Sequence, residues 1–175
     1  MRAAASITAC LLTLTPVATQ ALELRGGPLR QDFASLWAAG PAHERDWAVN
    51  AELAFDPVGA MLGGRLIPFV GGTVAPGTEV DKVYAGLNWE LSSDRLFLRL
   101  GLGAALHDGE TENPATFGRR RQFGSSLLFH VPVEIGARVT ERLSVSAYFD
   151  HMSNAGLADL NPGLDTAGLR LGWRF

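Results

Sequence analysis

The sequence has one cysteine, Cys10, one lysine, Lys82, and no long apolar run after its N-terminal segment. We expect Cys10 to be removed with that segment, so the mature chain would have neither a disulfide nor a thiol nucleophile. Basic residues are also scarce, with 15 Lys and Arg against 18 Asp and Glu, which argues against a nucleic-acid binder. Without a spanning helix, the mature chain can cross a membrane only as a closed β-barrel.

The first 21 residues have the features of a secretory signal peptide. Arg2 provides a short positive region, residues 3–17 form a mostly apolar run, and residues 19–21 read Thr-Gln-Ala, a small-x-small cleavage site. The run is too short for a membrane-spanning helix. We therefore predict a signal peptide over residues 1–21 and a single mature domain over residues 22–175.

Four segments, 47–55, 83–91, 96–106 and 169–175, alternate between apolar and polar or glycine residues. Strict alternation is typical of β-strands, because successive side chains point to opposite faces. The non-apolar face carries five charged residues, Glu52, Glu90, Arg99, Arg170 and Arg174. A soluble β-sandwich also alternates but rarely buries so many charges together. In a narrow barrel they would pair inside the lumen, so the pattern favours a transmembrane barrel with an apolar outside.

The predicted fold is all-β: an eight-stranded antiparallel transmembrane β-barrel with both termini periplasmic. An even number of strands returns the chain to the side from which it started. The connection 57–63 is longer than usual for a periplasmic turn, and the first strand alternates poorly. The predicted strands are 22–31, 45–56, 64–74, 80–91, 95–107, 123–139, 142–153 and 165–175.

Three polar residues near the C-terminus share the lipid-facing parity of the last two strands. His151 and Ser153 are two residues apart, so they lie on one face of a strand about 6.5–7 Å apart along its axis. An imidazole at that spacing can deprotonate a serine for attack on an ester. Asp165 begins the next strand and is a candidate to orient the histidine if the strands form a hairpin. The alternative is a polar interfacial collar without chemistry.

Other candidate sites are weaker. His43-Glu44 lacks the second histidine of a zinc-binding helix, so we expect neither a metal nor a cofactor. His130 has lumen-facing parity, and we expect it to be a structural partner of Glu134.

Four stretches resemble the outer-membrane lipid A 3-O-deacylases, the PagL-type esterases. They are Ser-Ser-Leu-Leu-Phe-His at 125–130, Asp-His-Met-Ser-Asn-Ala-Gly-Leu at 150–157, Asn-Pro-Gly-Leu-Asp at 161–165 and Gly-Leu-Arg-Leu-Gly-Trp-Arg-Phe at 168–175. The resemblance is specific over about the last 55 residues and architectural before them. It implies an eight-stranded barrel that removes an ester-linked acyl chain from lipid A, at the 3-O position, with a serine, a histidine and an acid.

Carried over by position, the resemblance makes Ser153 the nucleophile, His151 the base and Asp165 the acid, where some members have glutamate. It also matches a loop around the site, where an oxyanion hole is expected, at Asn154, Gly156 and Asn161. From the lipid-facing position of the site we expect an acyl groove on the wall beside it. The expected groove residues are Ala147, Phe149, Leu169, Leu171 and Phe129.

The expected partners are lipid A as substrate, outer-membrane lipids, and the barrel-assembly machinery through the terminal Phe175, with a homodimer left open. Two other classes of function also stay open. One is a non-enzymatic structural or adhesive barrel, and the other is a phospholipase in the same membrane.

Overall fold

The computed structural model describes residues 22–31, 47–76, 80–111 and 122–175. The predicted signal peptide, residues 1–21, lies outside these ranges. Within them, no helix is long and apolar enough to span a membrane.

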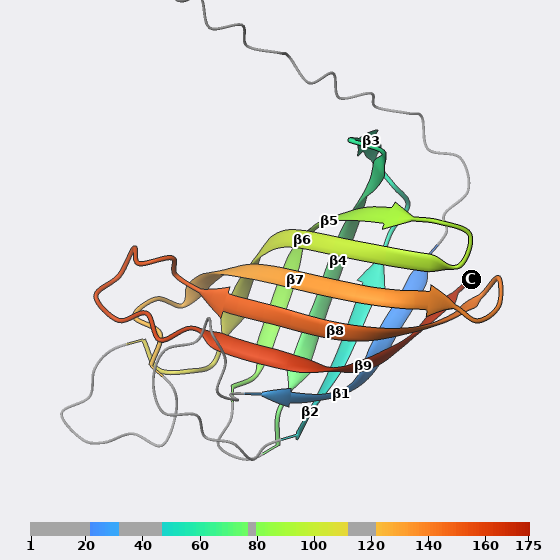
Figure 1. The fold of residues 1–175 in the computed structure, drawn as a ribbon. Coiled ribbons are helices and arrows are strands. Elements are labelled where there is room, and N and C mark those ends of the chain that lie inside the picture. Colours follow the sequence, from blue (N-terminus) through green and yellow to red (C-terminus); the bar gives the residue numbers. More distant parts are fainter. Residues whose placement is uncertain (1–21, 32–46, 77–79, 112–121) are drawn as a thin grey trace, which may run out of the picture.

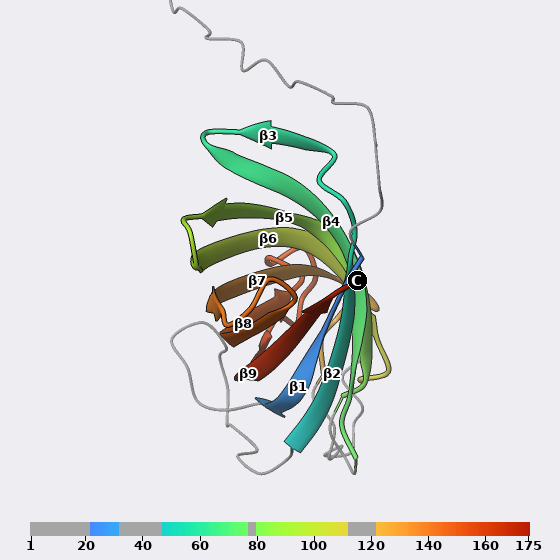
Figure 2. The same cartoon turned by 90° about the vertical axis from the view of Figure 1, so that its right-hand side faces the viewer.

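The described chain is a closed antiparallel β-barrel (Figures 1 and 2). Neighbouring strands pair in the order β2-β1-β9-β8-β7-β6-β5-β4, and β2 pairs with β4 to close the ring of eight. The short β3 pairs only with β4 and extends the wall at one end. The strands are β1 (Glu23–Gln31), β2 (Trp47–Ala54), β3 (Gly59–Met61), β4 (Gly64–Val74), β5 (Lys82–Ser92), β6 (Leu96–His107), β7 (Leu127–Arg138), β8 (Leu143–Ser153) and β9 (Leu164–Arg174). The predicted fold class is therefore confirmed.

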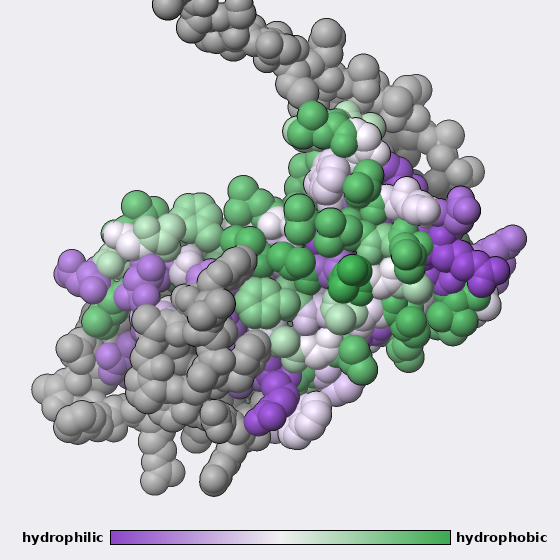
Figure 3. Space-filling view, in the orientation of Figure 1, coloured by the Kyte–Doolittle hydropathy of each residue, from purple (hydrophilic) through white to green (hydrophobic). Residues whose placement is uncertain are grey.

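The two faces of the wall differ as the alternation predicts. Along β8 the even-numbered residues are buried inside the barrel, while the odd-numbered residues are exposed or half-buried outside. Figure 3 shows the result on one side of the molecule, where mostly apolar surface covers the strands and more hydrophilic surface lies toward both ends. This is the distribution of a barrel that sits in a bilayer.

Two segments that looked irregular in the sequence are regular in the structure. The poorly alternating start of the mature chain forms β1, with Arg25 inside and Leu24 outside. The connection 57–63 is not a long loop, because it contains β3 and a two-residue turn at Leu62 and Gly63. Both turn residues have positive φ, 49° and 77°, as a tight hairpin turn requires. The segment that seemed too long for a periplasmic turn is therefore a short hairpin that ends in a tight turn.

The two ends of the barrel have different connections (Figure 1). Short turns join β3 to β4, β5 to β6 and β7 to β8 at the end where the chain terminates. The first strand starts beside it, since Phe175 donates its backbone N–H to the carbonyl of Leu22 at 3.0 Å. The connection between β8 and β9, residues 154–163, lies at the opposite end. The periplasmic position of the termini stays a prediction.

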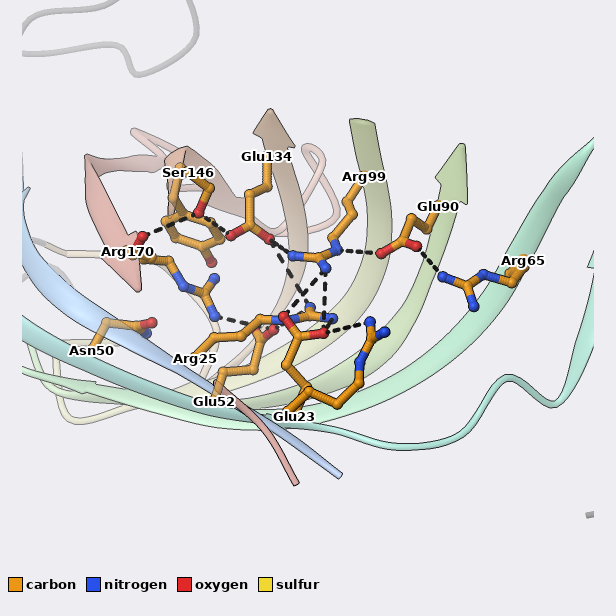
Figure 4. A network of polar contacts seen from close by, with 12 residues as sticks. Glu23, Arg25, Asn50, Glu52, Arg65, Glu90, Arg99, Glu134, Ser146 and Arg170 are labelled. Carbon is orange, nitrogen blue, oxygen red and sulfur yellow. Dashed lines mark hydrogen bonds and ion pairs between the residues drawn. The ribbon is translucent and has the colours of Figure 1, made fainter. Parts of the chain in front are cut away.

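The lumen near the short-turn end is filled by an arginine–glutamate network (Figure 4). Arg99 donates to Glu90 at 2.8 Å and Glu134 at 3.0 Å, and it also contacts Glu23. Arg25 bonds Glu23 and Glu52, and Ser146 donates to Glu134 at 2.5 Å. Because buried charges are tolerated only when paired and hydrogen-bonded, this network explains how the barrel encloses the charges.

The predicted pairing of His130 with Glu134 was wrong. His130 is buried inside the barrel, where its ring stacks on Tyr84 with centroids 4.2 Å apart, and its Nε2 lies 3.4 Å from the Tyr148 hydroxyl. Glu134 instead binds Arg99 and Ser146. Both residues have the expected inward parity, but they belong to different layers of the lumen.

Candidate active site

The last two strands bring the three predicted catalytic side chains together on the outer face of the barrel. His151 and Ser153 are consecutive outward-facing residues at the end of β8. Asp165 lies at the start of β9, where its Cα is the register partner of His151. The i, i+2 spacing and the hairpin register therefore place an acid, an imidazole and a hydroxyl in one row.

The row is hydrogen-bonded throughout. The Asp165 Oδ1 lies 2.7 Å from His151 Nδ1, and His151 Nε2 lies 3.0 Å from the Ser153 Oγ. Because a carboxylate accepts hydrogen bonds only, the Nδ1 bond assigns the proton to that nitrogen and leaves Nε2 as an acceptor. Ser153 then donates its hydroxyl proton to Nε2. This is the arrangement of an activated serine nucleophile with an oriented base.

The three side chains of the row become more exposed from Asp165 to Ser153. The Asp165 side chain is fully buried, the His151 side chain is 15% exposed, and Ser153 is half-buried at the open end. The carboxylate is thus protected from water, while the hydroxyl can be reached from outside. Phe129 of β7, the register partner of Ser153, is 44% exposed on the same outer face. The Ser153 hydroxyl is therefore bordered by the apolar ring of Phe129.

Gly163 leaves room for the imidazole of His151, a role that the sequence prediction missed. Its φ is +66°, and a Cβ atom built on it would lie 2.7 Å from His151 Cε1. Any side chain here would therefore push against the imidazole. The signal in the sequence was the glycine of Asn161-Pro162-Gly163, which reads as an ordinary turn until the hairpin places it beside His151.

The loop between β8 and β9 is tied together by Asn154. Its side-chain amide donates to the carbonyls of Phe123 and Leu160, at 2.8 and 2.6 Å, and its Oδ1 accepts from the backbone N–H of Gly156. The Asn154 backbone N–H donates to Asn161 Oδ1 at 3.0 Å. These bonds occupy the N–H groups of Asn154 and the backbone N–H of Gly156 in ordering the loop. Asn161 is exposed. Its Oδ1 accepts the bond from Asn154, so its amide nitrogen points away from the Asn154 N–H.

A hollow of about 630 Å³ lies on the outer wall, toward the short-turn end from the row. Ala147, Leu169 and Leu171 of the predicted acyl groove line it. Phe149 and Phe129 do not, and they lie on the strands nearer the site. Small residues form much of the lining, which consists of Gly26, Gly27, Pro28, Leu96, Ile135, Gly136, Ala137, Val145, Ser146, Ala147, Leu169, Arg170 and Leu171. Its volume is within the range of lipid and small-molecule sites.

The sequence matches one protein family and several solved structures. The family is described as lipid A 3-O-deacylase (PagL), and residues 40–174 match it. No curated protein matches the chain at a significant level. A structure described as the outer membrane enzyme PagL has the same fold at 20% identity, with a TM-score of 0.55, covering 89% of this chain and 99% of that one.

A structure of the Yersinia pestis outer membrane protein Ail in a phospholipid nanodisc is more distant. It is 12% identical, has a TM-score of 0.45, and covers 90% of this chain and 100% of that one. A likeness this weak carries no argument about function.

Proposed function

This chain belongs to the lipid A 3-O-deacylase (PagL) family of outer-membrane barrels, and we propose that it hydrolyses the 3-O acyl ester of lipid A with Ser153, His151 and Asp165. The observation that carries the proposal is the hydrogen-bonded row from Asp165 through His151 to Ser153, on the outer face of the barrel. A polar interfacial collar without chemistry would not require these three side chains to be hydrogen-bonded in this arrangement. A carboxylate, an imidazole and a hydroxyl in sequence are what acyl transfer requires.

In the first half of the reaction, Ser153 Oγ attacks the ester carbonyl carbon and gives its proton to His151 Nε2. Asp165 holds the Nδ1–H and stabilises the imidazolium that forms. The tetrahedral intermediate collapses as the C–O bond to the sugar breaks. The leaving alkoxide takes the proton from Nε2, which leaves an acyl-serine and a free sugar hydroxyl.

In the second half, water attacks the acyl-serine while Nε2 accepts its proton. The second tetrahedral intermediate collapses, Ser153 recovers its proton from Nε2, and the fatty acid leaves. Asn161 is the loop residue best suited to stabilise the oxyanion. Its Oδ1 is held by the N–H of Asn154, the residue after Ser153, so its amide is fixed beside the nucleophile with the nitrogen turned away from that bond.

The acyl chain is proposed to lie along the wall between the row and the hollow. Ala147 is four residues before His151 on β8, about 13 Å along the strand. Phe149 lies between them with the same outward parity. An acyl chain held at its ester end by Ser153 would follow this face toward Ala147, Leu169 and Leu171 without entering the lumen.

The test is the mass of lipid A from Gram-negative cells that carry no deacylase of their own. Expression of this protein should remove one ester-linked acyl chain, and Ser153→Ala should leave lipid A intact. Ser92→Ala, an exposed hydroxyl at the other end of the barrel, is the matched control and should behave as the unchanged protein.

Unaltered lipid A with the active protein, or deacylation by a correctly inserted Ser153→Ala barrel, would refute the proposal. Purified glycerophospholipids, assayed beside lipid A, separate a phospholipase from a lipid A esterase.

A further inference from the structure

The only lysine of the chain lies inside the barrel behind the candidate active site. Lys82 opens β5, and its side chain is fully buried. Its ammonium forms an ion pair with Asp150 and donates to Thr166 Oγ1 at 2.9 Å. A buried ammonium needs such partners, because an unpaired one is strongly disfavoured in a low-dielectric interior.

These two partners lie next to the catalytic row. Asp150 and Thr166 are Cα partners across β8 and β9, and the adjacent pair is His151 with Asp165. Successive residues of a strand point to opposite faces. Lys82 therefore binds Asp150 and Thr166 inside the barrel. The next residue on β8, His151, and the preceding residue on β9, Asp165, form their hydrogen bond on the outside.

The bridge crosses the lumen. Going around the ring from β5, β8 is the third strand and β9 the fourth of eight. Lys82 thus connects opposite walls of the barrel. Its contacts hold together both strands that carry the site, whereas a bond between neighbouring strands would hold only one junction.

The wall of the barrel has a weak junction between β5 and the site. The ladder between β7 and β8 is continuous, with Pro132 of β7 opposite Asp150. The register between β6 and β7 is instead interrupted at residues 101–102 and 131–132, and proline has no N–H to donate there. Because β5 and β8 lie on opposite sides of this interruption, the Lys82 bridge joins two parts of the wall that the ladder connects less completely.

We propose that Lys82 is a positioning residue for ester hydrolysis, which sets the alignment of His151 with Asp165 by holding Asp150 and Thr166 across the lumen. The inference rests on the proposed function of the outer row. Lys82 touches no reacting atom, so its loss should lower kcat through misalignment and leave the KM for a short soluble ester unchanged.

The main variant is Lys82→Met combined with Asp150→Leu, which removes the bridge without leaving a buried charge unpaired. We expect kcat per folded molecule to fall about 10- to 100-fold, the effect of a small misplacement of catalytic groups. The rate at which a fluorophosphonate labels Ser153 should fall in parallel. Lys82→Arg keeps a cation that can reach both partners and should restore most of the turnover.

Arg25→Met is the matched control. Arg25 is also a buried lumen cation, paired with Glu23, Glu52 and, more distantly, Glu134. Its register partner on β9 is Gly172, seven residues from Asp165. This variant should lower stability and leave kcat per folded molecule unchanged. An equal fall in kcat for Arg25→Met would mean that any loosening of the lumen acts on the site, and it would overturn the proposal.

Full kcat in the folded double variant would also overturn it. If the double variant does not insert, Thr166→Val takes its place, since it removes only the hydroxyl that Lys82 binds. A fall of about 3- to 10-fold, the value of one hydrogen bond, supports the proposal, and unchanged turnover refutes it. Ser153→Ala is assayed beside these variants. Activity in Ser153→Ala refutes the proposed function itself, whereas an inactive Ser153→Ala with normal lumen variants refutes only the role of Lys82.

Discussion

The barrel holds two groups of polar residues, one inside and one outside, and they are built differently. Inside, the arginine–glutamate network is closed on itself: Arg99 alone contacts three carboxylates, and its side chain is buried. Outside, the row from Asp165 to Ser153 has one hydrogen bond at each step and ends in a hydroxyl at the surface. The first group connects many strands, and the second connects two.

The difference separates polar residues that stabilise the fold from polar residues that perform chemistry. Charges that are buried in a narrow lumen have to be paired, and this requirement is enough to explain the arginine–glutamate network. A polar row on an apolar wall has no such explanation, because a lipid-facing position favours apolar side chains. We therefore expect changes in the arginine–glutamate network to affect stability and changes in the outer row to affect turnover, and five predictions test that division.

The largest effect should come from His151→Ala. Loss of the base should lower kcat by about four to six orders of magnitude, as for other residues that act as one catalytic unit. The double variant with Ser153→Ala should be little worse than either single change. Turnover of a soluble ester, expressed per folded molecule, measures this. Additive losses in the double variant would show that the two residues act independently.

Asp165→Asn should lower kcat about two orders of magnitude less than His151→Ala, because the acid orients the base and does not take part in bond formation. Asp159→Asn, an exposed change in the same loop, is the control and should keep full turnover. Equal kcat for Asp165→Asn and the unchanged protein would remove Asp165 from the site.

Arg99→Met should show the opposite behaviour, with a loss of stability and no loss of turnover per folded molecule. Removing the arginine leaves three carboxylates without their shared partner, a change that costs about 3–5 kcal/mol for a buried pair. Denaturant unfolding measures it. Arg95→Met, in an exposed turn, should stay within about 0.5 kcal/mol of the unchanged protein. A stable Arg99→Met barrel with reduced kcat would break the division between the arginine–glutamate network and the outer row.

Gly163→Ala should lower kcat about 10- to 100-fold, because the new Cβ would displace the His151 ring. Gly63→Ala provides the control. Gly63 also has positive φ, +77°, but the nearest atom to its Cβ position is 4.0 Å away, on Leu91, at the other end of the barrel. Both variants should lose similar stability from backbone strain. If both also lose similar turnover, the contact with His151 does not matter.

The smallest effect should be on the preference for the length of the substrate's acyl chain. Ala147→Trp fills the lipid-facing hollow, so it should reduce turnover of long-chain esters about 10-fold more than that of short soluble ones. Ala85→Trp adds the same bulk to the outer face of β5, away from the hollow, and should leave the ratio of long-chain to short-chain turnover unchanged. An unchanged ratio in Ala147→Trp would show that the acyl chain takes another path.

Much of this architecture could be predicted from the sequence, because alternation is a local signal. It predicted all eight strands of the ring and the face on which Arg99 and Ser153 lie. It missed β3 because three residues are too few to establish a period, and it underrated β1 because Gly26-Gly27-Pro28 interrupts the apolar pattern.

The contacts across the lumen could not be predicted. Parity gives the face of a residue but not its partner on the opposite wall, which depends on how the sheet closes and staggers. For that reason the sequence predicts the wrong partner for His130, which stacks on Tyr84 and not on Glu134, and it gives no partner for Lys82. The row of His151, Ser153 and Asp165 could be predicted, because it depends only on a spacing of two residues and on one hairpin. The catalytic roles of these residues stay predictions.

The half-buried Ser153 opens sideways from the wall, and this sets the units in which the enzyme would be measured. For the proposed reaction, the relevant quantity is the mole fraction of substrate among the lipids around the barrel, not its amount per litre. Adding inert phospholipid or detergent would dilute the substrate in two dimensions and slow the reaction with no change to the protein. The enzyme would thus respond to the composition of its own leaflet, and encounter by lateral diffusion would replace binding from solution.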